Sequence, residues 1–357
     1  MPAAKLETPL VPDFEITING APLPLEAKAN VLAVMVEDDV GLPGMFTFQL
    51  AGSMDQEDEA PWVDDEDLFA VGHAVEIKMG YGEELESLIA GEITGLEPEF
   101  ASNHLPTLSV RGYDRRHRLH RGRKTRTFVQ QKDSEVAAQI AKDAGLNAQA
   151  EDTQVVHDYV LQANQTDMDF LQERARRIHY EVIVNGKDLL FRPVAHAEGE
   201  ILTLSLQEDL LEFCPRLSAV RQINEIALRG WDPKNKKEFV GRAKSGDEAT
   251  QMGGQNNGAA LVESFFGAAT SMVGDRPVST QAEADQLAKA RFNNVALALI
   301  CGEGVCFGRT DLRSGKVIKV EGLGTRFSGQ YYVTTASHRY SGQLGYYTHF
   351  TVRRNAL

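Results

Sequence analysis

Apolar and polar residues alternate with a period of two through most of the first hundred residues, a pattern that predicts β-strands. Asn19-Gly20 is the turn pair typical of a β-hairpin. Glycine-rich segments separate the remaining alternating runs. Residues 1–113 are therefore predicted to form a β-rich first domain. Its expected strands are Phe14–Ile18, Val31–Val36, Met45–Leu50, Val75–Met79, Leu88–Leu96 and Leu105–Val110.

The period changes to that of a helix after residue 130. Ser134–Ala144 carries an apolar stripe at helical spacing, with Ser134 as the expected N-cap. Thr166–His179 repeats the pattern, with acidic residues in its first turn and arginines in its last turns, as the helix dipole favours. Tyr180–Val184 and Leu189–Arg192 then predict a hairpin. Residues 114–200 are interpreted as an α/β middle module.

The strand pattern returns in residues 201–357, which are predicted to form a second β-rich domain. An insertion at about 243–298 interrupts it. It has a polar, glycine-rich loop, a short helix at Leu261–Val273 with Phe265 and Phe266 as its apolar contacts, and a longer helix that starts at Thr280. The expected strands are Ile201–Leu206, Leu210–Val220, Glu225–Trp231, Glu238–Arg242, Gly304–Gly308, Val317–Val320, Tyr331–Ser337 and Tyr346–Arg353.

The end of the first β region and the end of the chain share a rhythm. Each has a strand closed by Gly-x-Gly, then a strand that ends in a turn, then a strand that ends near an arginine. The separation from Val75 to Val110 equals that from Val317 to Val352. The chain then carries two copies of one β unit, or it shows only the rhythm that any two antiparallel sheets share.

Composition narrows the function classes. The 357 residues carry a net charge of −14, which argues against a nucleic-acid binder that uses its whole surface. No run of about 18 apolar residues predicts a membrane span, and the N-terminus has no apolar signal core. We therefore expect synthesis in a cytoplasm. The sparse cysteines, Cys214, Cys301 and Cys306, favour reduced thiols.

No catalytic or metal motif stands out in the sequence. His117 and His120 have ligand-like spacing but lie among cationic side chains that would repel a metal ion. Cys301 and Cys306 have no second pair of ligands, whereas a structural zinc site needs four. Nucleophile, phosphate-loop and zinc-protease motifs are missing. The expectation is a protein without cofactor, without metal and without enzymatic activity.

A basic segment, Leu108–Phe128, joins the first β region to the middle module. Its charge is opposite in sign to that of most of the chain. It can form a phosphate-binding patch or make salt bridges to an acidic neighbouring domain or subunit, and the planar arginine fork and the acidic chain favour the second reading. The candidate interface residues of this segment are Arg115, Arg116, Arg118, Arg121, Arg123 and Arg126.

An acidic stretch between residues 55 and 67 flanks Pro61-Trp62. Such charge runs are usually solvated loops. The alternative is a docking loop anchored by its tryptophan, because buried aromatic residues dominate interface energetics. The candidate interface residues of this stretch are Trp62, Asp64, Asp65, Glu66 and Asp67.

Several segments resemble the phage late control gene D protein family, which overlaps the hub part of the VgrG spike proteins of contractile injection systems. The resemblance extends over essentially the whole chain. RPVSTQAEADQLAKARFN and GLGTRFSGQYYVT are similar to the injection-system branch. The most specific part is the string Gln162-x-Asn164-x-Thr166-Asp167-x-Asp169-Phe170-Leu171-x-x-Arg174-Ala175.

The resemblance implies a mainly β fold in which two tail-tube-like β-barrel domains flank a helix-containing module. It implies a homotrimeric baseplate hub whose six barrels adapt a hexameric tail tube to a trimeric central spike. The implied partners are the tube protein, the spike protein and baseplate wedge proteins, on a virion or injection particle. No specific nucleic-acid binding is expected. Strands Val31–Val36 and Tyr331–Ser337 are expected to pair across subunits by β-augmentation.

Full spike proteins of this family continue into an oligosaccharide-binding-type barrel and a needle, whereas this sequence stops at Leu357. The expectation is that the spike is a separate polypeptide or is not included here. Two alternative functions stay open: a cell-wall hydrolase carried on a tail tip, and a polyanion-binding module that uses the basic segment.

Overall fold

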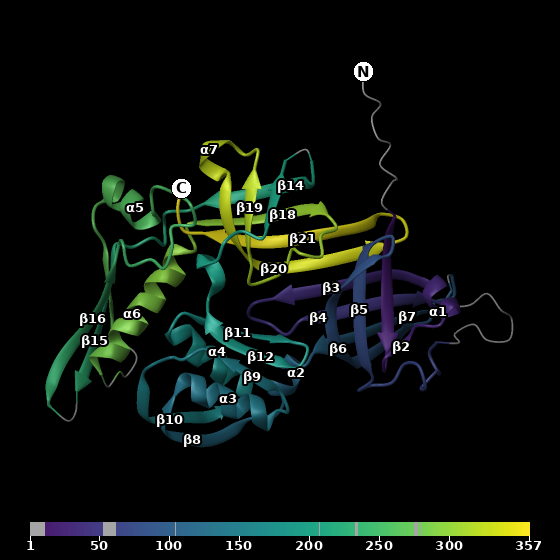
Figure 1. Cartoon of the computed structure of the whole chain (residues 1–357), viewed down its shortest axis with the longest axis horizontal. Helices are drawn as coiled ribbons and strands as arrows, with labels where there is room; N and C mark the ends of the chain where they lie inside the picture. Colours follow the sequence, from purple (N-terminus) through teal and green to yellow (C-terminus); the bar gives the residue numbers. More distant parts are fainter. Residues whose placement is uncertain are drawn as a thin grey trace.

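The structure is a computed structural model that describes residues 11–52, 62–103, 105–206, 208–232, 235–274, 278 and 280–357. Two β-rich halves share one large sheet, and a helix-containing middle module and an insertion pack beside it (Figure 1). The predicted mainly β fold with an α+β insertion is confirmed. In the described residues, no helix is long and apolar enough to cross a membrane.

The first half is a curled antiparallel sheet in the order β3-β4-β7-β6-β5-β1. Alternation along the strands sends Phe46, Phe48 and Leu50 into one core, where each is fully buried. The elements are β1 (Pro12–Ile18), β2 (Ala21–Pro22), α1 (Leu25–Ala29), β3 (Val31–Asp39), β4 (Met45–Ala51), β5 (Ala74–Tyr81), β6 (Glu84–Glu99) and β7 (Thr107–Asp114).

The second half repeats this arrangement in the order β14-β18-β21-β20-β19-β13. A single parallel bridge between Leu206 and Leu210 joins the end of β13 to the start of β14. The elements are β13 (Leu202–Ser205), β14 (Leu210–Leu217), β18 (Ile300–Phe307), β19 (Val317–Glu321), α7 (Gly324–Phe327), β20 (Gly329–Ser341) and β21 (Gly345–Arg354).

The two halves match in irregularities as well as in strand order. The pairing of β6 with β7 has a register shift between Ile93 and Gly95. The pairing of β20 with β21 has a register shift between Val333 and Thr335, which lie 240 positions after Ile93 and Gly95 in the sequence. The pairs β3–β4 and β14–β18 also shift at the same place in their strands. One pairing differs, because β1 is antiparallel to β5 whereas β13 is parallel to β19.

A seam between β3 and β20 joins the halves into one sheet (Figure 1). Its register runs from Thr335 opposite Asp39 to Ser341 opposite Ala33. The expectation that Val31–Val36 and Tyr331–Ser337 are edge strands that pair across subunits is therefore wrong. These segments belong to strands that pair with each other inside one chain, and strand order between segments so far apart cannot be read from alternation.

The middle module forms a two-stranded sheet, β10-β8, and a three-stranded sheet, β11-β12-β9. The basic segment ends in β8, which the sequence analysis did not predict, and α3 begins one residue before the expected Ser134. The elements are α2 (Arg116–Leu119), β8 (Lys124–Lys132), α3 (Asp133–Asp143), β9 (Asn147–Ala150), β10 (Val156–Gln165), α4 (Asp167–Arg177), β11 (Tyr180–Asn185), β12 (Asp188–Pro193) and η1 (Ala195–Ala197).

The insertion is larger than predicted. β15 and β16 pair in a separate sheet with β17 rather than with the second half, so the insertion begins before residue 243. The helix predicted at Leu261–Val273 instead spans Gly258–Phe266, and Thr270–Val273 forms a strand. Phe265 and Phe266 are exposed rather than packed. The elements are β15 (Glu225–Asp232), β16 (Lys237–Lys244), α5 (Gly258–Phe266), β17 (Thr270–Val273) and α6 (Gln281–Ala296).

Candidate assembly interface

The basic segment begins at a buried arginine. The Arg116 side chain is 1% exposed, and its Nε donates to Asp114 at 2.8 Å while Nη1 donates to the Asp39 carbonyl at 2.9 Å. The Asp114 carboxylate also accepts the Gly44 N–H at 2.7 Å. A Cβ at Gly44 would lie 2.8 Å from that carboxylate, so a larger residue there would push the Asp114 carboxylate aside. Arg116 therefore joins β7, β3 and the β3–β4 turn.

Glu92 of β6 collects the next cationic side chains. Arg118 makes a two-pronged contact with it, at 2.9 and 2.5 Å, and Arg115 lies 3.8 Å away. His117 lies 3.6 Å from the same carboxylate, and burial lowers the pKa of this histidine. The Arg118 side chain is about half exposed, whereas Glu92 is buried, so Arg118 covers a buried carboxylate.

Arg126 connects β8 to the motif on which the family resemblance rests. Its guanidinium donates to Gln162 at 2.8 Å, to Asp143 at 2.9 Å and to Asp167 at 2.7 Å. Asp167 also accepts from Lys124 at 2.6 Å. Gln162 is fully buried and donates to Asp167 at 3.0 Å. These contacts lie within one chain and hold β8 against the N-terminus of α4.

The remaining polar residues of the motif have structural tasks as well. Thr166 caps α4 by accepting the Asp169 N–H at 3.0 Å. Arg174 donates to the buried Asp133 at 2.5 Å, and His157 lies 3.3 Å from the same carboxylate. Burial alone would raise the pKa of Asp133, but the His157 hydrogen bond and the Arg174 charge hold it below its usual value.

The structure separates the predicted interface arginines into two groups. Arg116 is buried, and Arg126 is largely covered. Arg121 and Arg123 are exposed, although Arg123 donates to the Asn164 carbonyl. Arg121 and Arg123 are therefore the members of the segment best placed to meet another molecule, together with the half-exposed Arg118. Their interface role stays a prediction.

Trp62 is a core residue. Its side chain is 7% exposed, packs in the first core and donates through Nε1 to the Ala51 carbonyl at 3.0 Å. Its burial inside one chain leaves it unsuited to anchor a partner. Asp64, Glu66 and Asp67 are exposed, whereas Asp65 accepts the Leu68 N–H at 2.9 Å. The acidic residues 55–59 lie outside the described residues.

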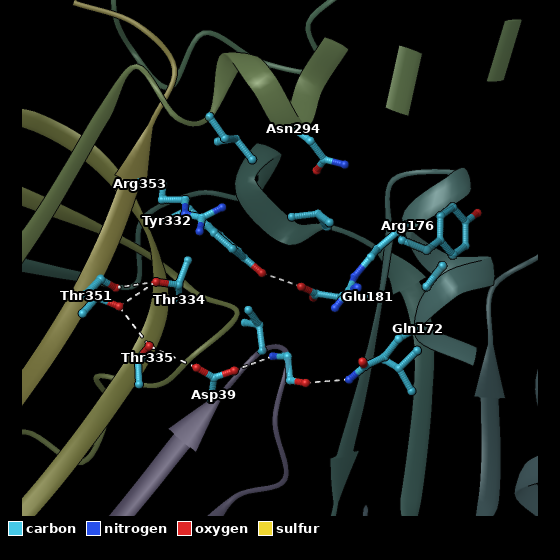
Figure 2. Close-up of a pocket in the computed structure, with 17 residues that line it drawn as sticks. Asp39, Gln172, Arg176, Glu181, Asn294, Tyr332, Thr334, Thr335, Thr351 and Arg353 are labelled. Carbon is cyan, nitrogen blue, oxygen red and sulfur yellow. Dashed lines mark hydrogen bonds between the residues drawn. The ribbon is translucent and has the colours of Figure 1, made fainter. Parts of the chain in front are cut away.

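A cavity of about 440 Å³ lies where both halves, the middle module and α6 meet (Figure 2). On one wall, Asp39 of β3 accepts the Thr335 hydroxyl at 3.2 Å, and Thr335 in turn accepts the Thr351 hydroxyl at 2.9 Å. On another wall, Gln172 of α4 donates to the Gly41 carbonyl at 2.6 Å. The polar lining therefore ties the parts of the molecule together.

The far wall of this cavity holds a buried carboxylate. Tyr332 donates to Glu181, which also accepts from Arg192 at 3.0 Å (Figure 2). Burial raises the pKa of Glu181 and raises that of Tyr332 well above its usual range. The Tyr332 hydroxyl therefore keeps its proton as a donor. No local sequence signal marks this site, because its residues come from distant elements.

Two histidines beside the cavity are neutral near pH 7. The His179 and His196 rings lie 4.9 Å apart, and burial lowers the pKa of both, that of His179 to about 4. Across the described residues, no group of three or more histidine, cysteine or acidic side chains is placed to hold a metal ion. The three cysteines are free thiols, and burial raises the pKa of Cys306 to about 12.

The fold is similar to those of tail proteins. The prophage MuSo2 43 kDa tail protein from Shewanella oneidensis has 11% identity and a TM-score of 0.71, with 96% of this chain and 98% of that chain covered. A tail protein from Neisseria meningitidis MC58 has 10% identity and a TM-score of 0.70, covering 96% and 97%. The E. coli c3393 protein, a type VI secretion system component, has 14% identity and a TM-score of 0.62, covering 96% and 77%.

These likenesses show the fold, and they agree with the tail-protein fold that the sequence resemblance implies. Membership of the late control gene D and VgrG hub branch stays a prediction. No curated protein matches the sequence. A family model described as the Alg8 N-terminal domain matches residues 9–342, and the chain belongs to this family.

Proposed function

We propose that this chain is a structural, non-enzymatic hub of a contractile phage tail or injection-particle baseplate. The observation that carries the proposal is the same six-strand order, with matching register shifts, found twice in one chain. Three such chains present six equivalent sheets, which suits a junction between a hexameric tube and a trimeric spike. Support also comes from the tail-protein fold.

The hub binds a second and a third copy of itself, the tail-tube protein, the central spike protein and baseplate wedge proteins. The exposed charges at Arg121, Arg123, Asp64, Glu66 and Asp67 are candidate contacts with these partners. Their surface position suits recognition that weakens as salt rises.

The test is the mass and symmetry of the purified full-length chain. Sedimentation equilibrium is expected to give three copies per particle, and class averages in electron microscopy are expected to show a ring with near-sixfold features. When it is mixed with a tail-tube protein, the chain is expected to bind the ends of the tubes. A chain that stays monomeric with the spike and tube proteins present would contradict the hub proposal.

A further inference from the structure

The contact between the two halves of one chain indicates how two copies of the chain can pair. By strand order and register shifts, β20 is the counterpart of β6, and β14 is the counterpart of β3. Inside the chain, β20 is longer than its neighbour β19, and its second part pairs with β3 of the other half. The seam therefore pairs β20, the long strand of the second half, with β3, the edge strand of the first half. The corresponding strands of the other halves are β6 and β14.

The outer edge of the end of β6 and the outer edge of β14, which correspond to the two strands of the seam, have no strand partner among the described residues. β6 pairs with β5 only up to Glu92, and Ile93 exchanges bonds with Gly72 and His73, after which β6 continues along β7 alone. The same bonds occur at Val333, just before the seam begins. On β14, only Leu210 has a bridge on the side away from β18.

We infer that β14 of one chain pairs antiparallel with the end of β6 of a second copy, in the register of the β3–β20 seam. This inference rests on the proposed trimeric hub. Transferring the seam register places Leu217 opposite Leu96, and Arg216 opposite Glu97 of the second copy. Both charged side chains are exposed, and their opposite charges favour this pairing.

The register also shows which residue pair contributes least to the proposed pairing between copies. Val40 donates to the Thr334 carbonyl at 3.1 Å. In an antiparallel pair every second residue directs its N–H and C=O toward the same neighbour, so the backbone groups of Val36 also face β20. The corresponding step between copies brings Pro215 opposite Pro98. Neither proline has an N–H, so this step forms no hydrogen bond. Prolines on exposed edge strands also hinder the addition of unrelated strands. Pro215 and Pro98 therefore favour pairing of β14 and β6 with each other over pairing with other strands.

The paired strands would make one continuous wall. Each chain contributes the run β14-β18-β21-β20-β3-β4-β7-β6 (Figure 1). Three such runs from three copies would close a ring. One face of the run is buried in the two cores, so the polar face is the one available to line the ring. The carboxylates of this face include Glu37, Glu97, Glu212 and Glu303, and Arg339 lies among them.

Disulfide trapping tests the register. Opposed residues at the Glu97–Arg216 step belong to a non-hydrogen-bonded pair, with Cα atoms about 4.5 Å apart, inside the range of about 4.4–6.8 Å for disulfides. The double variant Glu97→Cys/Arg216→Cys is therefore expected to give a disulfide-linked trimer on a non-reducing gel. Within one chain these positions lie at opposite ends of the run, about 34 Å apart along the sheet, so the link can only join copies.

Three controls accompany the double variant. Glu97→Cys alone leaves native Cys214 diagonal to it, at about 7–8 Å, and should not link. Arg216→Cys alone should not link copies either. Because native Cys301 of β18 lies directly opposite position 216 in the same chain, this variant and the double variant are both made with Cys301→Ser. Glu37→Cys/Ser337→Cys uses the same step of the intrachain seam and is expected to form a disulfide within one chain.

The outcomes separate the two proposals. If sedimentation shows a trimer and the double variant links no better than Glu97→Cys alone, the register is wrong while the trimeric hub stands. If the chain is monomeric, both fail. As a second measurement, Glu97→Arg and Arg216→Glu should each reduce the trimer fraction at least several-fold, and combining them should restore it. No restoration would overturn the pairing.

Discussion

Arg116 illustrates how a residue in a strongly basic run becomes part of the core. Its neighbours Arg115 and Arg118 are partly exposed and cover the Glu92 carboxylate from outside, whereas Arg116 turns inward to Asp114 and the Asp39 carbonyl. Charge counting along the sequence treats these three residues alike. The difference comes from the direction in which the short helix α2 points each side chain.

The first prediction follows from this burial. Arg116→Ala leaves the Asp114 carboxylate buried without its cation and is expected to lower the free energy of unfolding by about 3–5 kcal/mol. The measurement is urea denaturation monitored by fluorescence. Arg121→Ala, at an exposed arginine of the same segment, is the matched control, with an expected change within about 0.5 kcal/mol. Similar losses in the two variants would contradict the role assigned to Arg116.

His338 gives a prediction about pH. Its ring is fully buried on β20 and bonded to the Tyr346 hydroxyl at 2.8 Å, and burial lowers its pKa to about 3. The unfolded chain binds a proton here below about pH 6.5, whereas the folded chain does not until about pH 3. Stability is therefore full above pH 6.5 and falls as pH decreases through this window.

The charged groups that face His338 are Arg313, whose charge lowers its pKa further, and Asp38 and Asp311, which oppose the shift. His338→Gln is expected to make the pH dependence of the unfolding free energy between pH 6 and pH 4 shallower by about 1.4 kcal/mol per pH unit. Denaturation at a series of pH values measures this slope. An unchanged slope would show that His338 does not titrate as assigned.

At the scale of elements, the Gln162-to-Ala175 motif links β8, β10 and α4. Asp167 lies at the helix N-terminus, where the dipole favours a carboxylate, and it binds both Lys124 and Arg126. The motif is recognisable in the sequence, but its task is visible only once β8 pairs with β10 and brings Arg126 beside it.

The third prediction compares two aspartates of the first turn of α4. Asp167→Asn removes the charge that pairs with Lys124 and Arg126 and is expected to lower the free energy of unfolding by about 2–3 kcal/mol. Asp169→Asn, at the exposed position two residues later, is expected to lower it by about 0.5 kcal/mol. Thermal and urea denaturation check both values, and equal losses would argue against the proposed bracing role.

Strands were predictable where one face is buried and the other is not. Alternation located β1 and β4 because their inward residues are uniformly apolar. It missed β8, in which Phe128 is the one side chain assigned to a core, so almost no apolar period exists. It also could not order the strands, since the β3–β20 seam joins segments about 300 residues apart and no local signal encodes that pairing.

At the scale of the whole molecule, the halves share more than a seam. The curl of the first sheet brings Phe14 to within 4.8 Å of Tyr340 and Tyr81 to within 5.8 Å of Tyr346, measured between ring centroids. Tyr346, on β21 of the second half, is buried in the core of the first half. The core of the first half is therefore not complete when that half is taken alone.

The fourth prediction uses this shared packing. Tyr346→Ala is expected to cost about 3–5 kcal/mol and to raise amide hydrogen exchange in β1 and β5, although the substitution lies in β21. Tyr347→Ala, one residue later on the opposite face, is the control and should leave β1 and β5 protected. Exchange that increases only near β21 in both variants would show that the halves unfold independently.

The matched register shifts at Ile93 and Val333 show that the two halves repeat one backbone unit. The backbone pairing is the same in both halves while the side chains differ, as at Gly112 and its counterpart Val352. Each position of β6 from Ile89 to Glu99, and each position of β7, therefore has a counterpart 240 residues later in the same polypeptide. A substitution made at one position and then at its counterpart separates the requirements of the strand geometry from those of the surrounding contacts.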